Sequence, residues 1–252
     1  MNEVTKIPEY KAPSEVSGDY RDMLVRLLTR QLWAETATAE VFGRSIAAAP
    51  SWRDRYLAAE FTFEEAQHSQ MLIDVLEELG EDAEAIIEAR PDAGKFWHLD
   101  LDDWVHIAVF NFTVDRGGSQ QIMEYAESSY RPWAEKMGVV LADEEEHYSN
   151  GVDNLREFAK DPERLAHFQS VFNELLPNAV KRCFGRPEGA DNEYCLAHGL
   201  KRNSTEAVVN RYLTEMREYM AENGLKFPPF ENFEKAGAEL MPSTREIIGS
   251  LQ

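Results

Sequence analysis

The sequence predicts an all-α fold, and three observations support this prediction. Apolar residues recur at helical spacing through six long segments. No segment shows the apolar–polar alternation of a half-buried strand, and proline or glycine separates most of the segments. With 252 residues, of which 43% are hydrophobic, the chain is long enough to bury a sizeable core. We expect an extended N-terminal arm over residues 1–19 and a single domain over residues 20–252.

The first two predicted helices cover residues 20–48 and 52–79. In the first helix Glu35 lies on the apolar stripe, whereas Glu40 is rotated about 140° away from it. Ser51 is suited to cap the second helix, and Gly80 is suited to end it. A short helix is predicted over residues 81–90, and a loop is predicted over residues 91–99. The stripes of the two long helices consist of Leu24, Leu28, Glu35, Ala39 and Phe42, and of Leu57, Phe61, Glu65, His68, Leu72 and Leu76.

The third predicted helix covers residues 101–137 and the fourth residues 138–160, which completes a core bundle over residues 20–160. Gly117 and Gly118 each weaken the third helix by about 1 kcal/mol relative to alanine. They leave room for a substrate or a close helix crossing, or else mark a kink. Pro132 is expected to bend its last turns. The two stripes consist of Trp104, Ala108, Asp115, Ile122, Met123 and Ala126, and of Leu141, Glu144, His147, Val152 and Leu155.

Beyond the bundle, residues 161–252 are expected to add helices and a tail. Pro162 suits the first turn of a fifth helix that reaches Arg182. Residues 183–203 are rich in glycine, proline and asparagine, so we expect irregular structure there. A sixth helix should run from Ser204 to about Gly224, followed by a tail with at most one short helix.

The chain carries two Glu-x-x-His motifs, Glu65 to His68 and Glu144 to His147. Residues i and i+3 share a helix face, so each motif points an oxygen donor and an imidazole at one object. Each motif also follows an acidic residue on an apolar stripe. Glu35 lies 30 residues before Glu65 (65 − 35), and Asp115 lies 29 residues before Glu144 (144 − 115).

This repeat is typical of a ferritin-like four-helix bundle with a dinuclear carboxylate site. Four carboxylates carry a charge of −4, which two divalent cations would neutralise. Without metal, most of these buried acids would have to bind protons. Iron and manganese both suit such donors. The alternative is a set of solvated acidic faces, because 46 residues are acidic and Asp103 to His106 has the same spacing without a matching acid.

Neighbours of the six candidate ligands have their own expected roles. If the bundle has approximate two-fold symmetry, Asp143 would orient His68 and Glu64 would orient His147. The reason is that a metal-bound imidazole usually donates a hydrogen bond from its other ring nitrogen. The alternative is that both are exposed acids of an acidic protein. Candidates to line a substrate cavity lie one turn from ligands, although ordinary core packing also explains them: Gln31, Phe61 and Asn111.

Composition excludes several classes of partner. The formal net charge of −20 repels nucleic acid and anionic membranes. The two cysteines are too few for a disulfide framework and form no Cys-x-x-Cys pair. The first residues lack the apolar core of a signal peptide, and no apolar run reaches the roughly 18 residues of a membrane span. We therefore expect a cytoplasmic protein with reduced thiols.

The motifs also resemble those of a known family, the catalytic subunits of the bacterial phenylacetyl-CoA epoxidase (phenylacetic acid catabolic) family. Members are ferritin-like di-iron monooxygenases. Asp115 is the most specific point of the resemblance, which covers roughly residues 20–230. The similar stretches are residues 20–26, 64–68, 114–115, 129–134, 144–147, 176–177, 183–185 and 198–202.

The resemblance implies a di-iron oxygenase that inserts one atom of dioxygen into a small organic substrate, such as an aromatic acyl-CoA that is epoxidised. It also implies an external electron donor in the form of a separate reductase, and a homodimer or a like-folded structural subunit. Lys201 and Arg202 are candidates to bind the CoA phosphates, as are Lys181, Arg182 and Arg186. The alternatives are a di-metal oxidase with a non-CoA substrate and a non-catalytic metal-binding or iron-storage protein.

Overall fold

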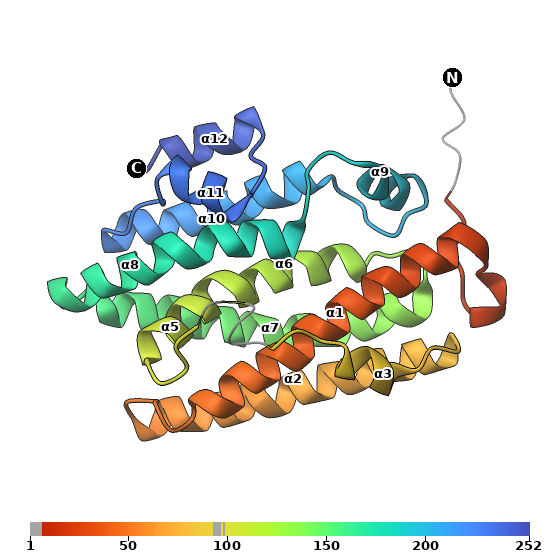
Figure 1. Ribbon diagram of the computed structural model, residues 1–252, viewed down its shortest axis with the longest axis horizontal. Helices are drawn as coiled ribbons and strands as arrows, with labels where there is room; N and C mark the ends of the chain where they lie inside the picture. The colour runs from red at the N-terminus through yellow and green to blue at the C-terminus, as the bar shows by residue number, and fades with distance from the viewer. Residues whose placement is uncertain (1–6, 93–96, 98) are drawn as a thin grey trace.

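The computed structural model describes residues 7–92, 97 and 99–252, and among these it contains helices and no strand, which confirms the all-α prediction. The long helices run along the long axis of the molecule (Figure 1). In chain order the elements are η1 (Pro13–Glu15), α1 (Gly18–Ser45), α2 (Trp52–Glu78), α3 (Ala83–Glu88), α5 (Trp104–Phe110), η2 (Asn111–Asp115), α6 (Arg116–Tyr125), α7 (Arg131–Phe158), α8 (Pro162–Ala179), η3 (Val180–Phe184), α9 (Ala190–Ala197), α10 (Thr205–Asn223), α11 (Phe230–Ala236) and α12 (Pro242–Gly249).

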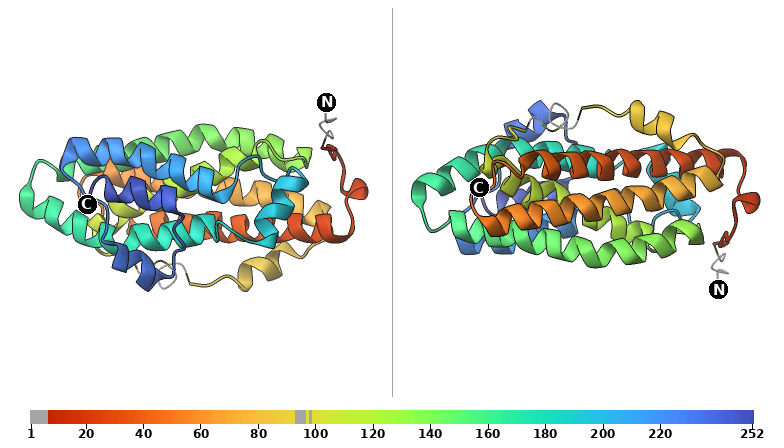
Figure 2. Two further views of the ribbon diagram at one scale, coloured as in Figure 1. Left: turned by 90° about the horizontal axis from the view of Figure 1, so that it is seen from above. Right: turned by 90° about the horizontal axis from the view of Figure 1, so that it is seen from below.

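A four-helix bundle forms the centre of the molecule. Its members are α1, α2, α7 and the continuous stretch of α5, η2 and α6. Seen from below, α1, α2 and α7 run side by side (Figure 2). The additional helices α8 and α10 lie on the opposite side from α2, with α11 and α12 beyond them (Figure 1). This arrangement is the ferritin-like bundle with added C-terminal helices that the sequence predicts. No described helix is long and apolar enough to cross a membrane.

The buried apolar residues form two separate clusters along the bundle. One contains Phe42, Phe61 and Val152, together with much of α8 and α10. The other contains Leu28 and Leu72 on α1 and α2, together with the first half of α7. The candidate metal ligands lie between these two clusters on every helix of the bundle. Apolar packing on both sides therefore surrounds a polar middle layer.

Several helix ends follow from local sequence as predicted. The hydroxyl of Ser51 accepts a hydrogen bond from the backbone N–H of Asp54 at 3.1 Å, which caps α2. The hydroxyl of Ser204 caps α10 in the same way. Gly80 and Gly224 follow α2 and α10 with φ of 85° and 75°, a left-handed conformation that glycine adopts without a steric penalty. The short helix predicted over residues 81–90 is α3.

The boundary between the third and fourth long helices was predicted wrongly. The third ends at Tyr125, and α7 begins at Arg131 instead of residue 138. Pro132 lies in the first turn of α7, where its missing N–H group has no intrahelical partner to lose. The intervening turn is held from outside. Ser129 N–H donates to the carbonyl of Gly199, and Arg131 N–H donates to the carbonyl of Tyr10.

The five-residue π-helical turn η2 changes the register of the third long helix. Met123, predicted on the buried stripe, is 41% exposed, because it lies eight residues after Asp115 on α6 and is therefore rotated about 80° away from it. Gly117 provides a close helix crossing and not a helix break, because a Cβ atom there would lie 3.0 Å from Cys183 Sγ of η3. No heavy atom lies within 4 Å of the corresponding Cβ position at Gly118.

Two predictions for the C-terminal part were incomplete. Residues 183–203 contain α9, and the tail contains two short helices, α11 and α12, where at most one was expected. Helix α11 buries Phe233 in the larger apolar cluster, and α12 buries Ile248 in it. Such short helices are stabilised by packing and not by their own sequence. Residues 93–96 and 98 of the predicted loop over 91–99 lie outside the described residues.

Candidate metal centre

The six predicted ligands are all buried, and each exposes at most 5% of its surface. They come from α1, α2, η2 and α7, one or two from each element of the bundle. Four of them can each offer one donor atom such that all four atoms lie within 4.8 Å of one another: Glu35, Glu65, His68 and Glu144. The remaining two also face this group. His147 Nδ1 lies 3.3 Å from Glu65 Oε1, and the negative charge of Glu65 helps to raise the pKa of the buried Asp115 carboxyl.

The orientation of these donors fits a bound metal. His68 Nδ1 lies 3.7 Å from Glu35 Oε2, 3.8 Å from Glu65 Oε2 and 3.9 Å from Glu144 Oε1, which is too far for hydrogen bonds. Three buried donor atoms at the centre have no hydrogen-bond partner, namely Glu65 Oε2, His68 Nδ1 and His147 Nδ1. Buried polar atoms are normally satisfied. A cation between them would provide the missing interactions.

The second nitrogen of each imidazole contacts an acid from the facing helix. His68 Nε2 lies 3.1 Å from Asp143 Oδ2, and His147 Nε2 lies 2.8 Å from Glu64 Oε2. These are the crossed pairs expected from two-fold symmetry. With the Nε2 proton donated to a carboxylate, each ring presents Nδ1 to the centre of the site. Asp143 and Glu64 are partly exposed, so they link the buried site to the surface.

Without metal, the buried groups of this layer strongly shift one another's pKa values. Burial, reinforced by the negative charge of Glu65, raises the pKa of Glu35 to about 7 and that of Asp115 to about 8. Burial opposes protonation of the imidazoles, but the surrounding carboxylates outweigh it and raise the pKa of His68 to about 12 and that of His147 to about 11. The metal-free site therefore holds several protons near neutral pH.

We expect metal binding to release at least the protons of the two imidazolium rings, because metal ligands must be deprotonated. The affinity for metal should therefore fall as the pH falls from about 8 to about 6, because Glu35 and Asp115 also gain protons in this range. Titration with Mn²⁺ in a weakly buffered indicator solution measures this release. His198→Gln, which alters a ring stacked on Tyr194, is the matched control. Equal affinity at both pH values would contradict the expectation.

A family model described as Phenylacetic acid catabolic protein matches residues 2–241. The chain belongs to the phenylacetic acid catabolic protein family. The match confirms the resemblance at the level of the family. No curated protein matches the chain. Like the sequence motifs, the buried carboxylate and imidazole layer lies entirely within the residues that match the family.

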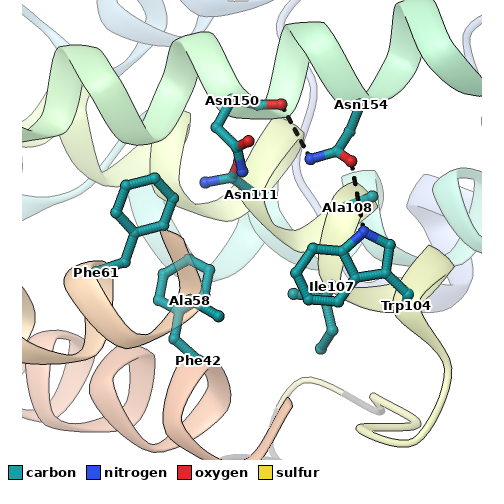
Figure 3. A pocket seen from close by; sticks show the side chains of 9 residues that line it. All are labelled: Phe42, Ala58, Phe61, Trp104, Ile107, Ala108, Asn111, Asn150 and Asn154. Carbon is teal, nitrogen blue, oxygen red and sulfur yellow. Dashed lines mark hydrogen bonds between the residues drawn. The ribbon is translucent and has the colours of Figure 1, made fainter. Parts of the chain in front are cut away.

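In this family member, two of the three candidate cavity residues, Phe61 and Asn111, line a small closed pocket (Figure 3). The ring of Phe61 lies 4.2 Å from the ring of His147, and the amide of Asn111 contacts Asp115. Gln31 lies elsewhere, between Glu35 and Met137. A role in substrate binding stays a prediction for all three. The other lining residues are Phe42, Ala58, Trp104, Ile107, Ala108, Asn150 and Asn154.

The cations predicted to bind CoA phosphates have partners within the chain. Lys201 Nζ donates to Gln121 Oε1 at 2.9 Å, and burial lowers the pKa of this lysine. Arg202 Nε donates to the carbonyl of Glu127 and lies 3.5 Å from its carboxylate. Lys181 Nζ donates to the carbonyl of Ala236. A phosphate would have to replace these contacts, and the predicted role remains untested.

One group of possible ligands was missed by the sequence analysis. His167 Nε2 lies 3.2 Å from Asp103 Oδ2, and together with His106 they could offer donors within 4.8 Å of one another. His167 comes from α8 and half of its side chain is exposed. No sequence signal links α8 to the start of α5. A surface ion pair explains this group without a metal.

Proposed function

We propose that this chain is a di-iron monooxygenase whose metal site is formed by Glu35, Glu65, His68, Asp115, Glu144 and His147. The observation that carries the proposal is the set of buried donor atoms without partners at the centre of the bundle. Two iron ions suit this mixture of carboxylates and imidazoles, and manganese suits it as well. Bound iron would supply the reduction of dioxygen, with electrons from a separate reductase, so that one oxygen atom enters an organic substrate and the other leaves as water.

The chain's own residues support such chemistry in three ways. Asp143 and Glu64 hold the imidazole rings so that Nδ1 faces the centre. The apolar clusters on both sides exclude bulk water from the layer, which strengthens electrostatic interactions inside it. Phe42 and Phe61 form an apolar wall beside His147, next to the small closed pocket. The pocket is too small to hold a water molecule, so a substrate group would enter it only if Phe42 or Phe61 moved aside.

An aromatic acyl-CoA is the substrate that we propose first, because the chain belongs to the phenylacetic acid catabolic protein family. A second candidate is an oxidase of a non-CoA substrate. It is favoured by the net charge of −20 and by the internal contacts of Lys201 and Arg202, since both disfavour a polyanionic ligand.

Iron-loaded protein supplied with a reductase and isotopically labelled dioxygen should transfer one labelled atom to phenylacetyl-CoA, as detected by mass spectrometry. The double variant Lys201→Gln/Arg202→Gln should raise KM by about tenfold or more, because charge-assisted hydrogen bonds to phosphate are lost. Its metal content should equal that of the wild type.

Different outcomes separate the candidates. Incorporation of the label into other aromatic substrates but not into acyl-CoA would favour the second candidate. Growth of a ferric mineral core without labelled product would contradict the oxygenase proposal and indicate iron storage. An unchanged KM in the double variant would remove Lys201 and Arg202 from the substrate site.

We also propose that α2 pairs with a second copy of the chain or with a like-folded subunit. Trp52, Tyr56 and Phe63 are 80%, 58% and 64% exposed and lie on one side of this helix. The helix occupies an edge of the bundle (Figure 1). The variant Trp52→Ser/Phe63→Ser should shift the purified protein, alone or mixed with its partner subunit, to the monomer in light scattering. Unchanged metal content would serve as the control for folding. Assembly equal to that of the wild type would exclude this surface.

A further inference from the structure

We propose that Gln31 and Asn111 are positioning residues that make Glu35 and Asp115 bind metal through one oxygen each. This inference rests on the proposed metal centre. It assigns one amide to Glu35 and the other to Asp115, the two acids that lie outside the Glu-x-x-His motifs and are called the outer carboxylates here. It gives both residues a role different from the cavity lining that their spacing predicts.

The two amides occupy equivalent places in the bundle. Each lies four residues before an outer carboxylate, so amide and acid share a helix face. Gln31 Nε2 donates to Glu35 Oε1 at 2.9 Å, and Asn111 Nδ2 donates to Asp115 Oδ2 at 2.6 Å. Gln31 is 7% exposed and Asn111 only 1%. One oxygen of each outer carboxylate is therefore occupied before any metal arrives.

The other oxygen of Glu35 faces the site. Glu35 Oε2 lies 3.7 Å from His68 Nδ1, one of the donor atoms without a hydrogen-bond partner. Glu65 shows a different arrangement, because its Oε1 faces His147 and its Oε2 faces His68. Both oxygens of Glu65 would therefore be available to hold metal. Glu35 instead offers only Oε2 to the site, because its Oε1 accepts the hydrogen bond from Gln31. In the same way, the hydrogen bond from Asn111 occupies Oδ2 of Asp115 and leaves only Oδ1 for a metal.

The orientation of each amide is set by further donors. Trp133 Nε1, which can only donate, gives a hydrogen bond to Gln31 Oε1 at 2.9 Å. The NH₂ group of Gln31 must therefore point toward Glu35. On the other side Asn150 Nδ2 donates to Asn111 Oδ1 at 3.1 Å.

A second indole supports the asparagine side of the site. Asn154 donates to the backbone carbonyl of Asn150 and accepts from Trp104 Nε1, and Figure 3 shows both contacts. The indole of Trp133 thus fixes the Gln31 amide independently of a metal, and the Asn150 side chain holds the Asn111 amide oxygen. The two amides are preorganised to hold the carboxylates.

The chemical consequence concerns the coordination number of the metals. A carboxylate that is free to rotate can bind one metal through both oxygens, which fills an additional coordination position. A carboxylate whose second oxygen accepts an amide N–H bond leaves that position open. Gln31 and Asn111 would therefore preserve open positions on the metals for dioxygen or substrate.

Cobalt-loaded protein provides a test that does not depend on turnover. The visible d–d absorption of Co²⁺ is strong in four- and five-coordinate sites and weak in near-octahedral six-coordinate sites. We expect wild type, Gln31→Met and Asn111→Leu each to hold two Co²⁺ ions, with absorption per cobalt up to about twofold lower in each variant, because each variant frees one carboxylate at one of the two ions. Gln121→Met, which alters a buried glutamine bonded to Lys201, is the matched control and should keep the wild-type spectrum.

The outcomes distinguish this proposal from the proposed function. Failure of the wild type to bind cobalt would overturn the metal centre and this inference with it. Wild-type spectra in both amide variants, at two cobalt ions per chain, would overturn only the positioning role. If Gln31→Met fails to fold, Trp133→Phe removes the donor to Gln31 while keeping a buried ring. A wild-type spectrum in Trp133→Phe would then overturn the proposal for the Glu35 side.

Discussion

Replacing Glu65 or His147 with alanine is expected to remove most of the bound metal. Glu65 faces both imidazoles, and His147 lies on the opposite side of the site from His68. Removal of an orienting residue typically lowers metal affinity by about 10- to 100-fold, so the loss of a ligand should have at least this effect. Metal analysis of purified protein should show about two ions per chain in the wild type, as a dinuclear site requires, and far fewer in each variant.

Glu40→Ala is the matched control for these variants. Glu40 lies on the same helix as Glu35, but it is paired with Arg44 and Arg90 away from the site. Its loss should leave the metal content unchanged. Bound metal should also raise the Tm of the wild type and of Glu40→Ala, but not that of Glu65→Ala, because a ligand stabilises only the protein that binds it. Full occupancy in both ligand variants would exclude the proposed site.

The second large effect is expected from Gly151→Ala on α7. A Cβ atom there would lie 2.7 Å from the backbone nitrogen of Phe112 and 2.8 Å from its Cα. Both atoms belong to the backbone of η2, so neither can move aside as the tip of a flexible side chain could. Overpacking of this kind costs about 1–3 kcal/mol or more. Because η2 carries Asn111 and Asp115, the variant should also lose metal affinity.

Gly138→Ala on the same helix should have the opposite effect. No heavy atom lies within 4 Å of the corresponding Cβ position, so alanine gains helix propensity of up to about 1 kcal/mol without a clash. Urea denaturation of the metal-free proteins compares the two free energies of unfolding, and metal analysis supplies the second measurement. Equal stability of the two variants would show that α7 does not need its close approach to η2.

The sequence alone determined the helical class and which six side chains gather in the polar layer. Both follow from spacing along single helices, because residues i, i+3 and i+4 share a face whatever the rest of the chain does. The helix ends at Ser51, Gly80, Ser204 and Gly224 are equally local, since a cap depends on a hydroxyl or a left-handed glycine within a few residues. The role of the six side chains as metal ligands stays a prediction.

Only the tertiary structure decided where the third long helix ends and how the two amides are oriented. The turn before α7 is held by backbone hydrogen bonds to Tyr10 and Gly199, which are far away in the sequence. Gln31 shares a helix face with Glu35 in the sequence, but its orientation depends on Trp133, which lies 102 residues away. The short helices α11 and α12 likewise exist because Phe233 and Ile248 find an apolar surface. Contacts between distant segments have no local signal, so the fold itself had to supply them.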